Sequence, residues 1–482
     1  MNDTDAKSSA IKSVLGFSIP SWINAVIGIV TIPFVTRVFE PDVLGKFNLF
    51  NTYGAILQGI SLVGLNQGLM RFYHEPSGRN TAVGLYKLCQ AIVTFTTVII
   101  ALVVLVFSNK FSDAICGEVN LYVSVCLCLV VATVAFLTIK ISLYRIQDSL
   151  FAYGVLVVLM NACAKTTYLG ATFLDNKFIG AISLLTASYV LITILYLVQD
   201  FGRYRGQAVV FGTEEVVPLL KYSLPLVPTL FVAQINTALP TLLIAEFLDY
   251  SQVAMYTSAF YIVSIMAIAQ SGVIIFWPAF VFKNYIKQPK LLSTACEIIT
   301  SVMIIFGLMV LLFQDLFYLV IGPAYRESQC FFAMLVFSSV CYAISETTGI
   351  GITISKKTYL NSAGYFVSSL VTFALCYMLI PNLALTGAAC AVAAAALAML
   401  IIKSWIGHIY YKVVGSPLKL CLALAFFVTL VALNPFVLQL FWLRTGLILF
   451  VMLITCLIYH KEMALCLKIL AGLSKGNAET KK

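Results

Sequence analysis

The chain has 482 residues, of which 61% are hydrophobic and only 10% are charged. Charged residues approach a quarter of an ordinary soluble domain, so this composition, with a mean hydropathy of +0.99, excludes a soluble globular protein. The formal net charge is +10, from 30 basic and 20 acidic residues.

Apolar segments with no charge recur along the whole chain. A helix needs roughly 20 apolar residues to cross about 30 Å of hydrocarbon. In chain order, the windows that predict such helices are 13–36, 47–70, 88–109, 119–139, 149–174 (interrupted only by Lys165), 178–199, 222–245, 253–282, 298–314, 328–345, two within 358–402, 420–443 and 445–459. The sequence therefore predicts 14 membrane-spanning helices, with the two in 358–402 joined at Pro381-Asn382.

The connectors between these segments are too short to form a soluble domain. The predicted organisation is a tail at 1–11, a lobe of six spans at 12–200, a linker at 201–220, a second lobe of six spans at 221–411, two further spans at 418–460 and a tail at 461–482. The first ten residues are polar and the apolar stretch after them is too long for a signal-peptide core, so we expect no cleavable signal.

The distribution of Lys and Arg predicts how the chain sits in the membrane. With the amino terminus in the cytoplasm, 23 of the 30 basic residues fall on the cytoplasmic side and Lys165 falls within a span. The remaining six face outward, at Arg37, Lys46, Lys110, Lys177, Arg326 and Arg444. Positive charge favours the cytoplasmic side, so both termini are predicted to lie there, and the net charge needs no nucleic-acid partner.

Short sequence marks repeat at nearly constant spacing. The segment 17–20 (FSIP) returns as 222–225 (YSLP), Phe39 returns as Phe247, Phe47 as Tyr256, and 178–181 (FIGA) returns as 385–388 (LTGA). The four intervals agree to within a few residues and each unit holds six spans, so both copies enter the membrane in the same direction. This pattern is typical of transporters with two parallel halves around a substrate cavity.

Prolines fall in the first span of each half, at positions 20, 33, 225, 228 and 240. Proline removes a backbone hydrogen bond and bends a helix. Matching broken helices predict the wall of the cavity, although kinks that serve packing alone are the alternative.

Several segments resemble Wzx-type polysaccharide flippases. Residues 35–45 (VTRVFEPDVLG) resemble the end of the first span in that family, and 64–73 (GLNQGLMRFY) the end of the second. Residues 355–358, followed by 380–382 (IPN) and 386–389 (TGAA), resemble a further family stretch. The sequence departs from the family pattern at 38–40 (VFE) and at Ala384, where a glycine is common.

This resemblance implies an all-α membrane protein of the multidrug/oligosaccharidyl-lipid/polysaccharide (MOP) exporter superfamily, located in the bacterial inner membrane. Such proteins move undecaprenyl-diphosphate-linked repeat units of O-antigen, capsule or exopolysaccharide to the outer leaflet. The implied partners are the lipid-linked oligosaccharide, membrane lipids, H⁺ or Na⁺ as a coupling ion, and the polysaccharide polymerase machinery. No cofactor is expected.

Polar side chains retained within or beside spans are the candidates for a cavity that holds a sugar-phosphate head group. Charge at the middle of a span costs about 2.5–3.5 kcal/mol, so Lys165 either faces a polar lumen or reaches the outer interface. Arg37 and Arg71 are cavity cations or interfacial anchors. Asn24, Gln234 and Asn236 suit sugar hydroxyls or hydrogen bonds between helices.

Two carboxylates are candidates for ion coupling, namely Glu346, which alternatively lies in the interface, and Asp148 at a cytoplasmic mouth. We expect no enzyme, because His74, His408 and His460 lack partners at ligand spacing and no phosphate-binding loop is present, and we predict no metal site.

The alternative functions are a drug or cation antiporter of the same superfamily, a lipid II flippase and, least favoured, a glycan polymerase. The antiporter would need carboxylates within spans of the first half, where we find only Asp148 at a mouth. The polymerase would need a large outer loop, and every predicted outer loop is short.

Overall fold

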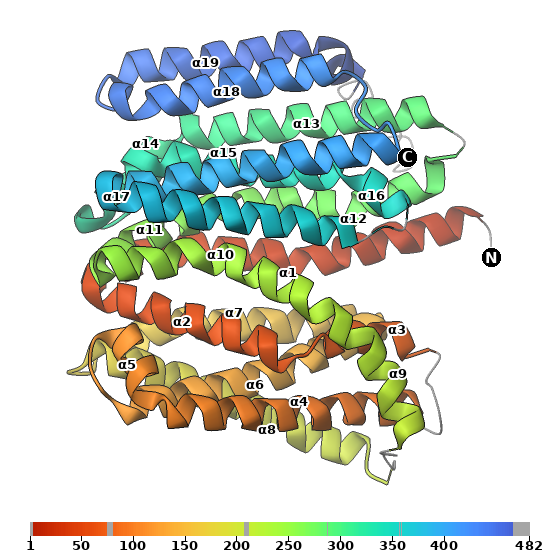
Figure 1. The fold of residues 1–482 in the computed structure, drawn as a ribbon, viewed down its shortest axis with the longest axis vertical. Helices are drawn as coiled ribbons and strands as arrows, with labels where there is room; N and C mark the ends of the chain where they lie inside the picture. Colours follow the sequence, from red (N-terminus) through yellow and green to blue (C-terminus); the bar gives the residue numbers. More distant parts are fainter. Residues whose placement is uncertain are drawn as a thin grey trace, which may run out of the picture. The chain divides into compact units, whose positions relative to one another are not determined.

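The computed structural model describes residues 3–74, 81–206, 212–286, 288–355, 357 and 359–465, and helices dominate these ranges (Figure 1). The helices are α1 Asp3–Val38, α2 Pro41–Ser61, α3 Leu65–Phe72, α4 Ala82–Val106, α5 Ser108–Cys116, α6 Leu121–Ile146, α7 Leu150–Ala171, α8 Lys177–Arg203, α9 Thr213–Ser223, η1 Leu224–Leu226, α10 Val227–Phe247, α11 Tyr250–Val263, α12 Met266–Asn284, α13 Pro289–Leu312, α14 Gln314–Val320, η2 Pro323–Ser328, α15 Gln329–Thr348, α16 Ile350–Ile354, α17 Tyr359–Tyr410, α18 Pro417–Val437 and α19 Phe441–Ile458.

Within the described residues, 11 helical stretches are long and apolar enough to cross a membrane. One of them, α17, has 52 residues and covers two predicted spans, and α1 contributes the shorter apolar stretch Trp22–Val38. The predicted class, an all-α protein that crosses the membrane many times, is confirmed. The count of 14 is compatible with these helices and stays a prediction.

Packing divides the chain into two compact units. Unit 1 comprises Met1–Ser258 together with Gly322–Tyr325, and unit 2 comprises Ala259–Ile321 and Arg326–Lys482. The predicted boundaries of lobes, linker and tails stay predictions. Residues 1–2 and 466–482 of the tails and 207–211 of the linker lie outside the described residues, whereas α1 already begins at Asp3 and α9 at Thr213.

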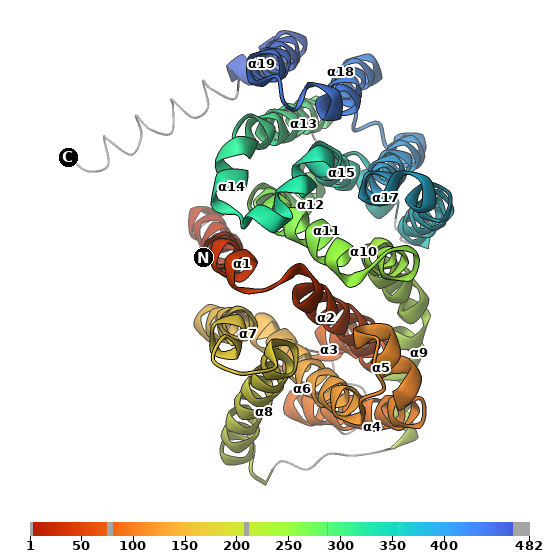
Figure 2. The same ribbon diagram turned by 90° about the vertical axis from the view of Figure 1, so that its left-hand side faces the viewer.

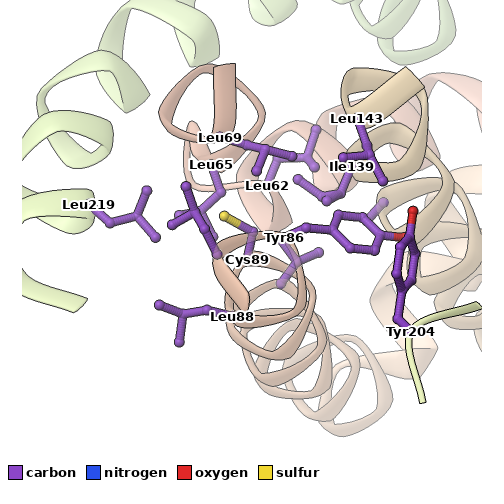
Figure 3. Packing of buried hydrophobic residues seen from close by; sticks show 13 residues of the cluster. Leu62, Leu65, Leu69, Tyr86, Leu88, Cys89, Ile139, Leu143, Tyr204 and Leu219 are labelled. Carbon is purple, nitrogen blue, oxygen red and sulfur yellow. The ribbon is translucent and has the colours of Figure 1, made fainter. Parts of the chain in front are cut away.

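Unit 1 is built around α6, which packs against α2, α3, α4, α7 and α8 (Figure 2). Its inner face is apolar, and Leu143 and Ile139 meet Tyr86 and Cys89 of α4 in a buried cluster with Leu65 of α3 (Figure 3). Burial of such side chains against other helices, rather than hydrophobicity alone, fixes which face of a membrane helix points inward.

Unit 2 is built around α15, which packs against α12, α13, α17 and α18. Both α6 and α15 are the fourth span of their repeat, and in both repeats a short helix precedes this span, α5 from Ser108 and α14 from Gln314. The interval between these two starts agrees with the interval between the repeat marks in the sequence.

The break between the two spans of α17 lies at Ala384, two residues after the predicted joint. Its backbone angles, φ 47° and ψ −131°, are not helical and belong to a region that glycine adopts far more readily than alanine. Leu385 then begins the next helical stretch at the predicted repeat mark. The backbone therefore carries local strain at Ala384, within the pair Ala384-Leu385 at which the sequence departs from the family pattern.

We expect Ala384→Gly to raise the free energy of unfolding by about 1 kcal/mol, because glycine adopts this conformation without a Cβ clash. Thermal unfolding in detergent measures the change. The matched control Ala388→Gly, in the helix one turn later and fully buried, should lower stability, since glycine weakens a helix interior. A lower melting temperature for Ala384→Gly would contradict the expectation.

Candidate functional site

A buried ion pair joins the carboxy-terminal parts of two helices of unit 1. Lys140 on α6 contacts Asp200 on α8, and the two side chains are 1% and 11% exposed. Tyr86 of α4 donates a hydrogen bond of 2.6 Å to the other oxygen of Asp200 and accepts one from Gln90. The carboxylate is therefore satisfied from two neighbouring helices.

Tyrosine rings surround the ammonium group of Lys140. Its Nζ lies 5.0–5.9 Å from the ring centroids of Tyr86, Tyr144, Tyr196 and Tyr204. Figure 3 shows the rings of Tyr86 and Tyr204 close to one another, with centroids 6.1 Å apart. Ring faces attract a cation, so this cage lowers the cost of keeping a charged lysine out of water.

Unit 2 carries a second ion pair, in which only the lysine is buried. Lys403 on α17 donates to Glu346 on α15 at 2.6 Å, and the lysine side chain is 2% exposed while that of the glutamate is 41% exposed. Tyr365 donates to the same carboxylate oxygen at 3.2 Å, and its ring centroid lies 4.5 Å from the lysine Nζ. Unlike the pair in unit 1, this one has an accessible carboxylate.

A cavity of about 130 Å³ adjoins the second pair, lined by Glu346, Lys403 and side chains of α12 and α17. One wall is Trp277, whose Nε1 donates to the carbonyl of Thr347 and whose side chain is buried. Asn361 adds a polar group to the lining. This volume suits a few water molecules or an ion and is too small for a chain of sugars.

The two pairs occupy matching places in the repeat with reversed polarity. Lys140 and Glu346, on the central helices α6 and α15, are separated by the interval of the repeat marks. Their partners, Asp200 and Lys403, are separated by the same interval to within one helical turn. Each repeat thus joins its fourth and sixth spans by one ion pair.

Lys140→Met should lower the free energy of unfolding by about 3–5 kcal/mol, because it leaves the Asp200 carboxylate buried without its cation. Adding Asp200→Asn should restore most of that loss. Thermal unfolding in detergent measures both. The control Lys46→Met breaks the more exposed pair with Asp42 and should cost less than about 1 kcal/mol. Equal losses for the two lysine variants would contradict this account.

Further charges fix the two carboxy-terminal helices to unit 2. Arg444 of α19 pairs with Asp315 of α14, and Lys419 of α18 bonds Glu297 at 3.3 Å and Glu462 at 2.7 Å. Burial raises the pKa of the Glu462 carboxyl, but the hydrogen bonds from Lys419, the backbone and Glu297, together with the charge of Lys419, outweigh burial and hold that pKa below its ordinary value. The helix pair is thus bound at both ends.

The structure spreads the predicted charged residues over several helices of unit 1. Lys165 is half-buried on α7, which packs against α1. Arg37 is exposed in the last turn of α1, and Arg71 is exposed in the last turn of α3 with its guanidinium 5.6 Å from the centroid of Phe72. Asp148 is exposed and lies just after the end of α6. Its backbone φ is positive.

The predicted polar residues lie within helices. Asn24 is half-buried on α1, and its Oδ1 is buried without a hydrogen-bond donor among the described residues. Gln234 of α10 donates to the carbonyl of Ala55 on α2 at 3.2 Å, and Asn236 is 6% exposed. Gln234 therefore serves contact between helices, one of the two roles considered for it.

Sequence reasoning missed Lys140, Asp200 and Lys403, because windows that end at a charge assign that charge to a loop. The helices in fact continue for one or two turns beyond, so α6 ends at Ile146 and α17 at Tyr410. The repeat could have identified Lys140, because it lies one repeat interval before Glu346, which was already a candidate. Within the described part of the chain, no group of three or more His, Cys, Asp or Glu side chains could hold a metal ion.

The sequence profile of the family described as "Polysaccharide biosynthesis protein" matches residues 11–281, more than half of the chain. The chain belongs to this family. No curated protein sequence matches it.

Solved structures similar to this polysaccharide biosynthesis protein share its fold at low identity. A lipid II flippase MurJ in an inward closed conformation aligns with a TM-score of 0.69 and 14% identity, over 93% of this chain and 99% of that one. A multidrug resistance MATE family transporter of the MOP superfamily aligns in its inward-facing form at 0.59 and 12%, over 82% and 97%. An outward-facing structure of a multidrug resistance MATE family transporter of the MOP superfamily aligns with a TM-score of 0.55 and 14% identity, over 83% of this chain and 95% of that one. The predicted membership of the MOP superfamily is confirmed.

Proposed function

We propose that this protein is a flippase that moves a polyprenyl-diphosphate-linked oligosaccharide from the cytoplasmic to the outer leaflet of a bacterial inner membrane, for synthesis of a surface polysaccharide. The family match over residues 11–281 carries the proposal, because it joins polysaccharide synthesis to a chain built of membrane-spanning helices. The proposed activity is transport, without covalent chemistry.

The substrate's head group explains why a protein is needed. Each unpaired hydroxyl or phosphate oxygen costs several kcal/mol to move through hydrocarbon, whereas the polyprenyl tail stays in lipid. Candidates for contact with the head group are the polar and basic residues that unit 1 carries, namely Lys165, Arg37, Arg71, Asn24, Gln234 and Asn236. Asn24 supports this role, since its buried Oδ1 accepts no hydrogen bond among the described residues.

Deletion of the gene in its native host tests the function directly. We expect loss of surface polysaccharide and accumulation of the lipid-linked oligosaccharide on the cytoplasmic leaflet, measured with a glycan-specific antibody and by mass spectrometry of extracted lipids. Undiminished surface polysaccharide in a strain without paralogues would sink the proposal.

A second strain separates this proposal from the lipid II flippase. A lipid II flippase would instead rescue a strain depleted of its own lipid II flippase, and the similarity to such a structure makes this comparison necessary. A drug or cation antiporter is less favoured, because Asp200, a largely buried acid on a membrane-spanning helix of unit 1, is already paired with Lys140.

Lys165→Ala should lower surface polysaccharide about tenfold without lowering the amount of protein in the membrane, because it removes a cation from a half-buried position on α7. Quantitative immunodetection of glycan and protein measures both. The control Lys110→Ala removes an exposed lysine in the first turn of α5 and should leave display unchanged. Equal display for the two variants would remove Lys165 from the mechanism.

For coupling to H⁺, Glu346 is the better of the two carboxylates predicted. It lies beside a cavity and holds the buried Lys403, so a proton on Glu346 would leave the lysine charge without its partner. A buried charge deprived of its partner favours another conformation of the chain. In contrast, Asp148 is exposed and outside this cavity.

Glu346→Gln should reduce at least tenfold the response of transport to an imposed pH gradient in vesicles, with normal protein abundance. A proteoliposome assay with fluorescently labelled lipid-linked substrate measures it, at several gradients. The control Glu118→Gln changes an exposed glutamate between α5 and α6 and should respond as the unmodified protein does. A normal response in Glu346→Gln would assign coupling elsewhere, with Na⁺ the next ion to test.

A further inference from the structure

Three ionisable side chains meet where the two carboxy-terminal helices join unit 2. Lys419, in the first turn of α18, bonds Glu297 of α13 at 3.3 Å and Glu462, beyond the end of α19, at 2.7 Å. The two carboxylate side chains are 12% and 11% exposed. Since α19 packs against both α13 and α18 (Figure 1), the cluster ties all three helices together.

Neighbouring groups cover this cluster. Tyr459 is fully buried, and its ring centroid lies 5.8 Å from the Nζ of Lys419. A Cβ on Gly415 would collide with the Oγ of Ser293 and with the Oε1 of Glu297. The chain that enters α18 therefore lies directly on the Glu297 carboxyl.

The charges of the cluster do not balance. Two carboxylates beside one ammonium group leave one negative charge in excess, and a charge kept from water without a partner is costly. The Oε1 of Glu462 accepts from Lys419, but its Oε2 is buried, and no N–H or hydroxyl group in the described part of the chain donates to it. The Glu462 carboxylate thus lacks both a neutralising charge and a donor.

One proton supplies both. The Glu297 carboxyl lies within hydrogen-bonding reach of Glu462, and two carboxylates without a proton are acceptors that cannot bond one another. Paired carboxyls in such surroundings bind a single proton between them. Lys419 lies closer to Glu462 than to Glu297, so Glu462 remains the anion of the ion pair and Glu297 carries the proton.

The other titratable groups around Glu297 do not cancel the excess charge. The groups that face it are neutral thiols and a phenol, at Cys296, Cys421 and Tyr459. The remaining basic residues of α12, of α13 and of the described segment after α19 are exposed to solvent, at Lys283, Lys290, His460 and Lys461. The acids of the other helices packed on α13, Asp315 and Glu346, pair with Arg444 and Lys403.

We propose that Glu297 and Glu462 form a binding site for one proton, which fastens the start of α18 and the chain after α19 to α13 and is released as the pH rises. The other end of the helix pair lacks this dependence, because the guanidinium of Arg444 keeps its charge and its partner Asp315 also accepts from Gln329 at 2.7 Å. In the predicted topology, the proton site faces the cytoplasm. The proposal goes beyond transport and does not depend on the substrate.

Infrared difference spectroscopy detects the proton directly. At about pH 7, we expect the protein to show the carbonyl stretch of a protonated carboxylic acid that Glu297→Gln lacks. The control Glu327→Gln changes an exposed glutamate of η2 and should keep this signal. Identical carboxylic acid signals in Glu297→Gln and in the unmodified protein would overturn the proposal.

Hydrogen exchange, read by mass spectrometry, tests the fastening. At about pH 9, peptides from the start of α18 and from the segment after α19 should exchange at least about threefold faster in the unmodified protein than in Glu297→Gln, whereas at about pH 6 the two should agree. Comparison at one pH cancels the effect of pH on exchange chemistry. Peptides around Arg444 should not differ, since the ion pair there keeps its charges.

A second variant removes the excess charge in another way. Glu462→Gln leaves Glu297 and Lys419 as a balanced pair, so it should also abolish the pH response. A pH response kept in both variants would contradict the proton site. Protection that Na⁺ or K⁺ restores at about pH 9, without the infrared signal, would assign a metal cation in place of the proton and also overturn it. Neither measurement uses a substrate, so both are independent of the polysaccharide assay.

Discussion

A charged side chain within a membrane helix is tolerated when a partner in the same low-dielectric surroundings neutralises it, and this requirement organises both units. In each, the most enclosed helix, α6 or α15, carries one such charge, and a helix two spans later carries its opposite. Each pair therefore ties the fourth span of a repeat to the sixth, in addition to apolar packing that has little directional preference in lipid. Tyrosines complete both sites by bonding the carboxylate and facing the ammonium group.

Unit 1 also contains close contacts between segments far apart in the sequence. Gly322, after α14, allows its loop to approach the backbone of Thr36 at a distance that any side chain would prevent, and Asn48 of α2 bonds Thr257 of α11. These contacts of unit 1 are neutral hydrogen bonds and close packing, whereas the two ion pairs join the fourth and sixth spans of each repeat.

The sequence predicted the class of fold, the repeat and the break near Pro381. Continuous apolar runs and matched segments such as FSIP and YSLP can be recognised in the sequence without knowing how the helices pack. It predicted the site less well. Lys140 and Lys403 were assigned to loops, since a window of hydropathy ends at a charge and contains no information on whether another helix supplies the partner. Glu346 was identified as a carboxylate of interest, but Lys403, which gives it its chemical character, becomes its neighbour only through the packing of α15 on α17.

The opposite order of charges in the two units has an evolutionary consequence. If the halves arose by duplication of one six-helix ancestor, no single substitution converts the order found in one half to that in the other without burying two like charges side by side, which costs far more than a neutral pair. A change from one order to the other therefore needs neutral residues as intermediates at the two places. If α6 and α15 were exchanged between the halves, Lys140 would face Lys403 and Glu346 would face Asp200, each a residue of the same charge. These two helices are therefore not interchangeable.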